Sequence, residues 1–115
     1  MDDRIISALQ HSNYMATISQ QQKNLKLKFI NDSLYAYNGG IFTVSPVLIS
    51  MVDLLIRKNQ KEAILIDDKN TPIKISNLSD FLDEILSLYG EATNSFHTDW
   101  EELRKARTVE KVIKS

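Results

Sequence analysis

Apolar residues recur every three or four positions from Leu78 to Ile113, and this is the longest periodic pattern in the chain. The spacing predicts an amphipathic helix. At 1.5 Å per residue such a helix would span roughly 54 Å, whereas a compact domain of this length has a radius of gyration of only about 13 Å. The distal half of the helix must therefore pack on another long helix of the chain, on another chain, or on nothing.

We expect this last helix over residues 77–113. Ser76 or Asn77 can cap its start, because both side chains accept hydrogen bonds from the free N–H groups of a first turn. Gly90 and the following Thr93–Ser95 segment are weak helix formers, and a glycine costs about 1 kcal/mol relative to alanine in a helix interior. The helix is thus expected either to continue through Gly90 or to bend there.

A second long helix is expected over residues 1–32. Residues 4–30 contain neither Pro nor Gly, and helical spacing places Tyr14, Ile18, Leu25 and Phe29 on one face. Residues 25–29 also alternate between apolar and basic, as a half-buried strand does, so a strand remains the alternative there. Asn31–Ser33 is expected to end whichever element forms, because these side chains compete for backbone groups.

Between the long helices, Asn38–Gly40 predicts a tight hairpin over residues 34–44, because Asn and Gly tolerate the positive φ of a type I′ turn. With Asn38 and Gly39 as the loop, Tyr35 opposes Phe42. One face of the hairpin then carries Tyr35, Tyr37, Phe42 and Val44, and we expect this face to be buried.

Ser45 followed by Pro46 predicts a helix start, with a hydroxyl at the N-cap and a proline where its missing N–H costs nothing. Apolar residues cover most of the circumference over residues 45–58, so we expect a central buried helix. A second hairpin is expected over residues 62–75, with turn formers at Asp68–Thr71 and Pro72 at a strand start or a sheet edge.

Composition narrows the class of protein. The 115 residues suit a single domain, and 14 basic against 15 acidic residues give a net charge of −1, which creates no global attraction to nucleic acid or to anionic membrane. The chain has no Cys and no apolar run of about 18 residues, and the acidic start MDDR is unlike a signal peptide. We expect a soluble intracellular protein without a membrane partner.

The residues offer little for catalysis. His97 and Glu101 stand one helical turn apart and could share a metal ion, but a site needs a third ligand and nothing places His11 nearby. Asp67 and Asp68 are better explained as turn residues than as cation ligands. No phosphate loop, nucleophile elbow or HExxH motif occurs. We expect a protein that is not an enzyme and that has no cofactor or metal.

Two sets of residues are candidates for binding. An interface with another protein is predicted for the aromatic and apolar residues on the distal half of the last helix, because aromatic residues dominate interface hot spots; these are Tyr89, Phe96, Trp100 and Leu103. The alternative set is basic and could contact the phosphates of a nucleic acid; it comprises Lys23, Lys26, Lys28, Arg104, Lys105 and Arg107.

Charge is divided between the two long helices. The segment 76–103 holds seven carboxylates and no Lys or Arg, whereas the segment 4–31 holds basic residues and no acid. We expect these helices to pair with each other, within one chain or between two chains, because unlike charges then lie close together.

Four segments carry a resemblance to a known family: YAYNGGIF, AILIDDKNTPIKISNLSDFLDEIL, YGEATNSF and LRKARTVEKV. Together they resemble a family of small uncharacterised proteins encoded by T4-like, cyanophage-like myophages of marine bacteria. The resemblance covers nearly the whole chain from Tyr14. It implies a phage gene product that acts in the cytoplasm of an infected bacterium or in the virion. It supplies no catalytic or binding residues.

The sequence therefore predicts an α+β fold of order αββαββα, with the long terminal helices packed together. For function it predicts a non-enzymatic phage structural, assembly or accessory protein that acts through protein contacts and forms a homo-oligomer. The alternative is a nucleic-acid-binding or transcription-modulating module that uses the basic helix segments.

Overall fold

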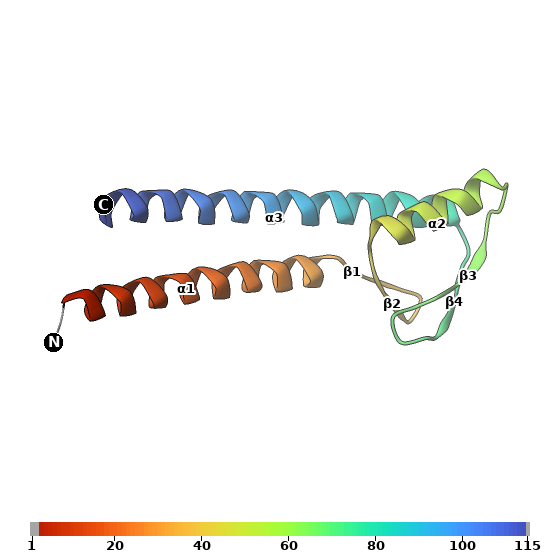
Figure 1. The fold of residues 1–115 in the computed structure, drawn as a ribbon. Coiled ribbons are helices and arrows are strands. Elements are labelled where there is room, and N and C mark those ends of the chain that lie inside the picture. The colour runs from red at the N-terminus through yellow and green to blue at the C-terminus, as the bar shows by residue number, and fades with distance from the viewer. Residues whose placement is uncertain (1–2, 115) are drawn as a thin grey trace. The chain divides into compact units, whose positions relative to one another are not determined.

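The computed structural model describes the backbone of residues 3–114 and the side chains of residues 7–106. Within that part the element order is αββαββα (Figure 1). The elements are α1 (Asp3–Asp32), β1 (Leu34–Tyr37), β2 (Gly40–Thr43), α2 (Pro46–Arg57), β3 (Ala63–Ile66), β4 (Pro72–Ile75) and α3 (Leu78–Lys114). The described strands pair only as β1 with β2 and β3 with β4. The predicted helix-rich α+β fold with paired terminal helices is confirmed.

Contacts along the chain group into two compact units. The helical unit comprises Met1–Lys28 and Phe96–Ser115, and thus one part of each long helix. The mixed unit comprises Phe29–Ser95, with both hairpins, α2 and the rest of the long helices. That the whole chain folds as a single domain stays a prediction.

The segment 25–29 is helical, so the strand alternative is wrong. Within the segment 25–29, Leu25 and Phe29 are half-buried and the three residues between them are exposed. This is the burial pattern of a helix and not that of a strand. The helix ends at Asp32 as expected. The buried Ser33 follows, and its hydroxyl donates to the Phe29 carbonyl at 2.8 Å while its own carbonyl accepts from the N–H of Val44 at 2.8 Å.

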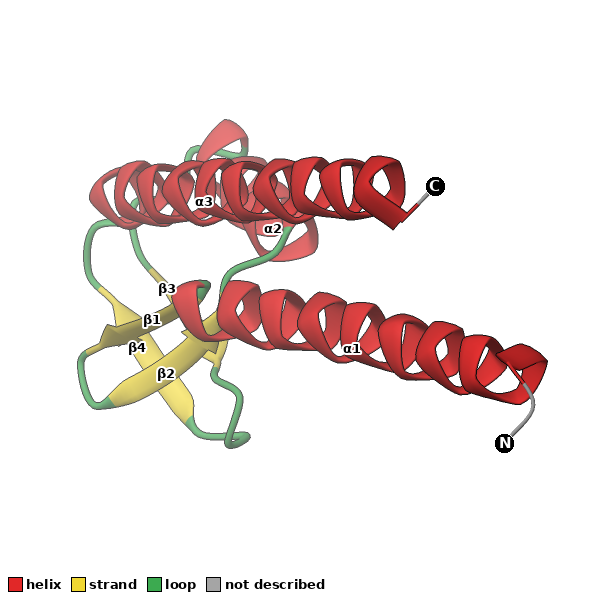
Figure 2. Cartoon of the chain, turned by 90° about the vertical axis from the view of Figure 1, so that its left-hand side faces the viewer, coloured by secondary structure: helices red, strands yellow, loops and turns green. Residues whose placement is uncertain are grey.

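The first hairpin has the predicted register. Tyr35 opposes Phe42 and Tyr37 opposes Gly40, and the loop residues Asn38 and Gly39 have φ of 47° and 82°, as a type I′ turn requires. The predicted face assignment is confirmed, because Phe42 is buried and both tyrosines are half-buried. Figure 2 shows this hairpin next to the second one in the mixed unit.

The second hairpin begins at Ala63, one residue later than predicted, and ends at Ile75 as predicted, with Pro72 as the first residue of β4. Its turn is organised by Asp67, whose Oδ1 accepts from the N–H groups of Lys69 at 3.0 Å and Thr71 at 2.8 Å. The expectation that turn geometry explains this aspartate is therefore supported. The same carboxylate reaches beyond its own turn, because its Oδ2 accepts from the N–H of Ile41 at 3.0 Å.

Hydrogen bonds of Asp67 and Asp68 with β2 join the two hairpins. The N–H of Asp68 donates to the Ile41 carbonyl at 2.9 Å, and the Asp68 carboxylate accepts from the N–H of Thr43 at 3.1 Å and from the Thr43 hydroxyl. The edge of β2 that faces away from β1 is thus covered by two aspartates instead of a third strand. An edge satisfied in this way does not offer its N–H and C=O groups to another chain.

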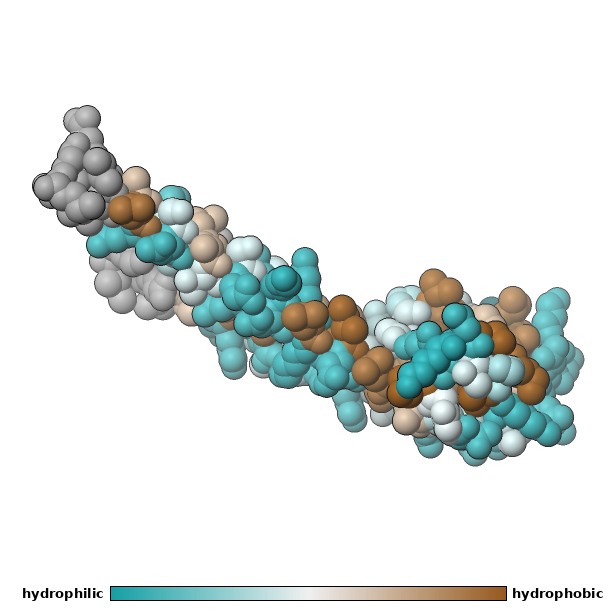
Figure 3. Space-filling model, turned by 90° about the horizontal axis from the view of Figure 1, so that it is seen from below, coloured by the Kyte–Doolittle hydropathy of each residue, from teal (hydrophilic) through white to brown (hydrophobic). Residues whose placement is uncertain are grey.

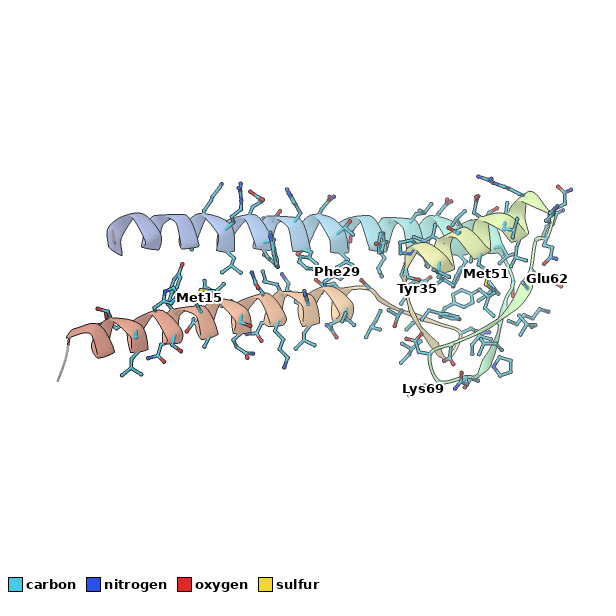
Figure 4. The ribbon with its side chains drawn as sticks, in the orientation of Figure 1. Met15, Phe29, Tyr35, Met51, Glu62 and Lys69 are labelled. Atoms are coloured by element: carbon cyan, nitrogen blue, oxygen red, sulfur yellow. The ribbon has the colours of Figure 1, made fainter. Side chains whose placement is uncertain are left out.

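Phe81 of α3 lies at the centre of the mixed unit's core. Its ring has edge contacts with the rings of Tyr35, Tyr37 and Phe42, at centroid distances of 5.6, 5.4 and 5.5 Å. Figure 4 shows Tyr35 pointing into this core from β1. The other buried members come from both hairpins, α2 and α3 and are Val44, Val52, Leu65, Ile73, Ile75, Leu78 and Ile85.

The helix α2 is less buried than predicted. Its start is as expected, with the Ser45 hydroxyl accepting from the N–H of Leu48 at 3.2 Å, and Val52 is fully buried. The prediction of a central helix buried around most of its circumference is wrong, because Val47, Met51 and Leu54 are exposed. The apolar side chains are more numerous than one packed face of a twelve-residue helix can bury against the two hairpins and α3.

The last helix continues through Gly90 and Thr93–Ser95 as one α-helix. Asn77 caps it, because its side-chain oxygen accepts from the N–H of Asp80 at 3.1 Å. The N–H of Leu78 donates to the Lys61 carbonyl at 2.9 Å, which ties the start of α3 to the loop before β3. The Thr93 hydroxyl bonds back to the Tyr89 carbonyl at 2.9 Å, so this weak helix former is satisfied inside the helix.

Replacing Gly40 with Ala is expected to destabilise the mixed unit. A Cβ at this position would lie 2.6 Å from Cγ1 of the buried Ile73, and overpacking of this kind costs about 1–3 kcal/mol. Gly90→Ala is the matched control, because its Cβ would meet nothing within 4 Å and it should stabilise α3 by up to about 1 kcal/mol. Urea unfolding midpoints that move in the same direction for both variants would contradict this account.

Stability is expected to fall in acid through Asp67. Hydrogen bonds from the N–H groups of Thr71 and Ile41 hold the pKa of its carboxyl below the usual range, so this contribution is complete above the unfolded pKa of about 4 and is lost as the pH falls through the lower, folded pKa. Asp67→Asn should be less stable than the wild type at pH 7, and the difference should shrink below about pH 4. Urea unfolding across pH measures it, and a difference independent of pH would rule out this origin.

Candidate interaction site

Within the helical unit, α1 and α3 run antiparallel and side by side (Figure 1). The helical unit has a small apolar interior, because Ile18 is its only fully buried hydrophobic residue among the described side chains. An open groove of about 590 Å³ lies between the two helices. Its apolar lining residues are Tyr14, Ile18, Leu25, Leu103 and Ala106.

One ion pair joins the two helices across this groove. Lys28 Nζ lies 2.7 Å from Asp99 Oδ2, and these side chains are 51% and 26% exposed. The pair confirms that basic α1 and acidic α3 are brought together. Its exposure makes it a determinant of alignment more than of stability, because exposed pairs contribute only about 0.2–1 kcal/mol.

The four predicted interface residues are distributed over both units. Phe96 and Trp100 contact each other one helical turn apart, with ring centroids 5.9 Å apart, and both are half-buried. Leu103 lies in the groove of the helical unit. Tyr89 belongs to the mixed unit, where its ring lies 6.2 Å from that of Phe29, whose side chain extends from α1 toward α3 in Figure 4.

The basic residues of the alternative site are dispersed and partly neutralised. Lys28 is paired with Asp99, and Arg104 donates to Glu101 at 2.8 Å. The exposed remainder is Lys23, Lys26 and Lys105. The Arg107 side chain lies outside the described residues.

Glu101 stands between Arg104 and His97 of its own helix. The hydrogen bond from Arg104 holds the pKa of the Glu101 carboxyl below its usual range, and His97 Nε2 lies 4.0 Å from the same carboxylate. No third metal-ligating side chain joins His97 and Glu101, since residues 7–106 contain no group of three or more such side chains. The helices of the described chain include none that is long and apolar enough to cross a membrane.

Sequence patterns missed a second apolar stripe on α1. Leu9 and Leu27 are 54% and 55% exposed, and helical spacing places them on the face opposite Ile18. Ala16 and Lys23 share that outer face, which Figure 3 shows as brown residues among teal ones. Leu9 and Ala16 are seven positions apart, but Lys23 stands at the next such position, so the stripe gives a weaker apolar signal than the Tyr14–Phe29 face.

Comparisons of the chain with models of protein families, with curated proteins and with solved structures gave no match.

The Lys28–Asp99 pair is expected to show weak coupling. A double-mutant cycle of Lys28→Ala and Asp99→Ala should give an interaction energy of about 0.2–1 kcal/mol, because both side chains are partly solvated. The Glu62–Lys74 pair of the second hairpin, at 3.9 Å and about 60% exposed on both sides, serves as the control and should give less. Urea unfolding supplies the four free energies, and a coupling of several kcal/mol would show that the pair stabilises the helical unit in its own right.

Proposed function

We propose that this protein works through protein contacts made by its helical unit, as a non-enzymatic structural, assembly or accessory protein of a phage, and that it self-associates. The observation that carries the proposal is the poor burial of the helical unit. One of its described hydrophobic side chains is buried, while Phe96, Trp100 and Leu103 remain half-exposed and Leu9 and Leu27 are each more than half exposed.

Two helices paired in this way gain little from each other. Most helical stability in proteins comes from packing of an apolar face and not from intrinsic propensity, and the fully buried side chain of Ile18 contributes only about 1.5–3 kcal/mol. A further partner would cover the remaining apolar surface of these helices. This reasoning supports contact with another protein more than it supports binding of a small ligand in an open groove.

The phage assignment rests on the sequence resemblance described above. Phage structural and assembly proteins commonly act by contact with copies of themselves or with other particle proteins, which agrees with two long helices that carry exposed apolar residues. The location proposed with it is the cytoplasm of an infected bacterium or the virion.

The nucleic-acid alternative has less support. Lys28 and Arg104 are already engaged by Asp99 and Glu101, and the acids near them would repel phosphates. A module of this kind would show affinity that falls steeply with salt, and binding to DNA or RNA at low salt that is lost on neutralising Lys23 and Lys26 would favour it.

Trp100→Ala is expected to weaken association of the full chain by about 2 kcal/mol, or roughly thirtyfold, because half-exposed aromatic residues at interfaces are common hot spots. Light scattering after size exclusion, over a hundredfold range of concentration, measures the effect. Thr98→Ala, an exposed position two residues away, is the matched control and should behave as the wild type.

Contact with a different protein is tested separately with a photo-cross-linking amino acid at position 100 in cells that express the gene. Discrete adducts, of the chain with itself or with one other protein, are expected. A chain that stays monomeric and forms no adducts from position 100, while the same cross-linker at position 98 behaves identically, would contradict the proposed function.

A further inference from the structure

We propose that the outer face of α1 from one copy docks into the α1–α3 groove of the next copy, so that the chain assembles head to tail. The inference rests on the proposed function and specifies its partner and its geometry. The docking stripe is formed by Leu9, Ala16, Lys23 and Leu27, with Lys26 at its border. The acceptor is the groove lined by Tyr14, Ile18, Leu25 and Leu103, with Asp99 and Glu102 on its rim.

The two surfaces are complementary in polarity. The stripe presents Leu9 and Leu27, each more than half exposed, and the groove presents apolar side chains over the same pair of helices. Covering both surfaces would remove from water the apolar area that the helical unit leaves exposed, which favours association roughly in proportion to that area.

The charges are complementary as well. Lys23 and Lys26 have no ion-pair partner among the residues that the structure describes, and neither has the exposed Glu102 on the groove rim. The groove's only described cation, Lys28, is held by Asp99 at 2.7 Å. The acceptor rim therefore carries a net negative charge, and the docking stripe carries a positive one.

The lengths of the two surfaces agree. The groove follows α1 from Tyr14 to Lys28, about 21 Å, and the stripe runs from Leu9 to Leu27, about 27 Å. Asp99 lies beside Lys28, near the C-terminal end of the acceptor's α1. The lysines of the stripe, Lys23 and Lys26, lie near the same end of the incoming α1. They therefore meet the rim acids only when the incoming α1 runs parallel to the α1 of the acceptor.

The stripe and the groove belong to different faces of one chain, so the contact is heterologous. Each copy then has one donor face and one acceptor face, and assembly closes into a ring or continues as an open array, depending on the rotation between neighbours. A twofold dimer would require one face to be complementary to itself, and the lysine-bearing stripe would then meet a second lysine-bearing stripe.

The test uses two variants that each block one face. Leu9→Lys with Leu27→Lys blocks the stripe, and Thr17→Arg with Glu102→Lys blocks the groove. Each variant leaves its second face intact. The blocked stripe of the first variant and the blocked groove of the second repel each other, because both have gained positive charge. Leu54→Lys with Leu86→Lys makes the same kind of change at exposed positions of the mixed unit and controls for folding, together with circular dichroism.

Light scattering is expected to give masses above two chains for the wild type and the control, one chain for each blocked variant alone, and two chains and no more for their equimolar mixture. A blocked variant that keeps the wild-type mass, or a mixture that stays at one chain, would overturn head-to-tail docking. A monomeric wild type that still forms adducts with another protein from position 100 would overturn head-to-tail docking and the proposed self-association, while leaving the proposed contact with a different protein in place.

Discussion

The mixed unit depends on the way in which β2 is satisfied on both edges. One edge pairs with β1, and the other bonds to Asp67 and Asp68, whose backbone and carboxylates together serve as a substitute for a strand. A lone two-stranded hairpin is marginal in water. The two aspartates join the two separate two-stranded sheets, and residues of both hairpins pack with Phe81 in the apolar core.

Burial is unequally distributed between the units. The mixed unit holds nearly all of the described buried hydrophobic residues, and Ile18 is the exception. The long helices belong to both units, so their mixed-unit portions, anchored by Phe29, Phe81 and Ile85, can hold a helical conformation that the helical unit alone would support weakly. Helix propagation from an anchored segment avoids the unfavourable nucleation step. The exposed apolar residues of the helical unit are therefore displayed on a preformed scaffold, and ordering them costs a partner less.

Local signals were sufficient to predict most of the fold. Asn38–Gly39 determined the register of the first hairpin, and Ser45–Pro46 determined the start of α2, because the physics of a turn or a cap lies within four residues. Asp67 could be predicted as a turn residue but not as the link to Ile41, since that bond joins residues 26 apart in the chain. The exposure of Val47 and Leu54 escaped prediction for the same reason: periodicity identifies apolar faces, and only the tertiary contacts decide how many of them are covered. The candidate interface on the aromatic residues of α3 stays a prediction, and the structure adds that Tyr89 belongs to the mixed unit and Trp100 to the helical unit.

A net charge of −1 conceals the feature that most constrains how the helical unit can pair. Basic residues are concentrated on α1 and acidic ones on residues 76–103 of α3, whereas residues 104–115 hold five basic residues and one Glu. Two copies of α1 placed side by side therefore repel unless the acids at positions 99–102 lie between them. Within one chain this condition is met by the Lys28–Asp99 pair. Between chains it disfavours symmetric contact through α1 and favours any arrangement in which α1 of one copy approaches α3 of another. Such pairs add little free energy each, but like-charge contacts cost several kcal/mol at an interface. In the proposed assembly, charge would therefore act mainly by excluding wrong arrangements, and the apolar stripe would supply the attraction among those that remain.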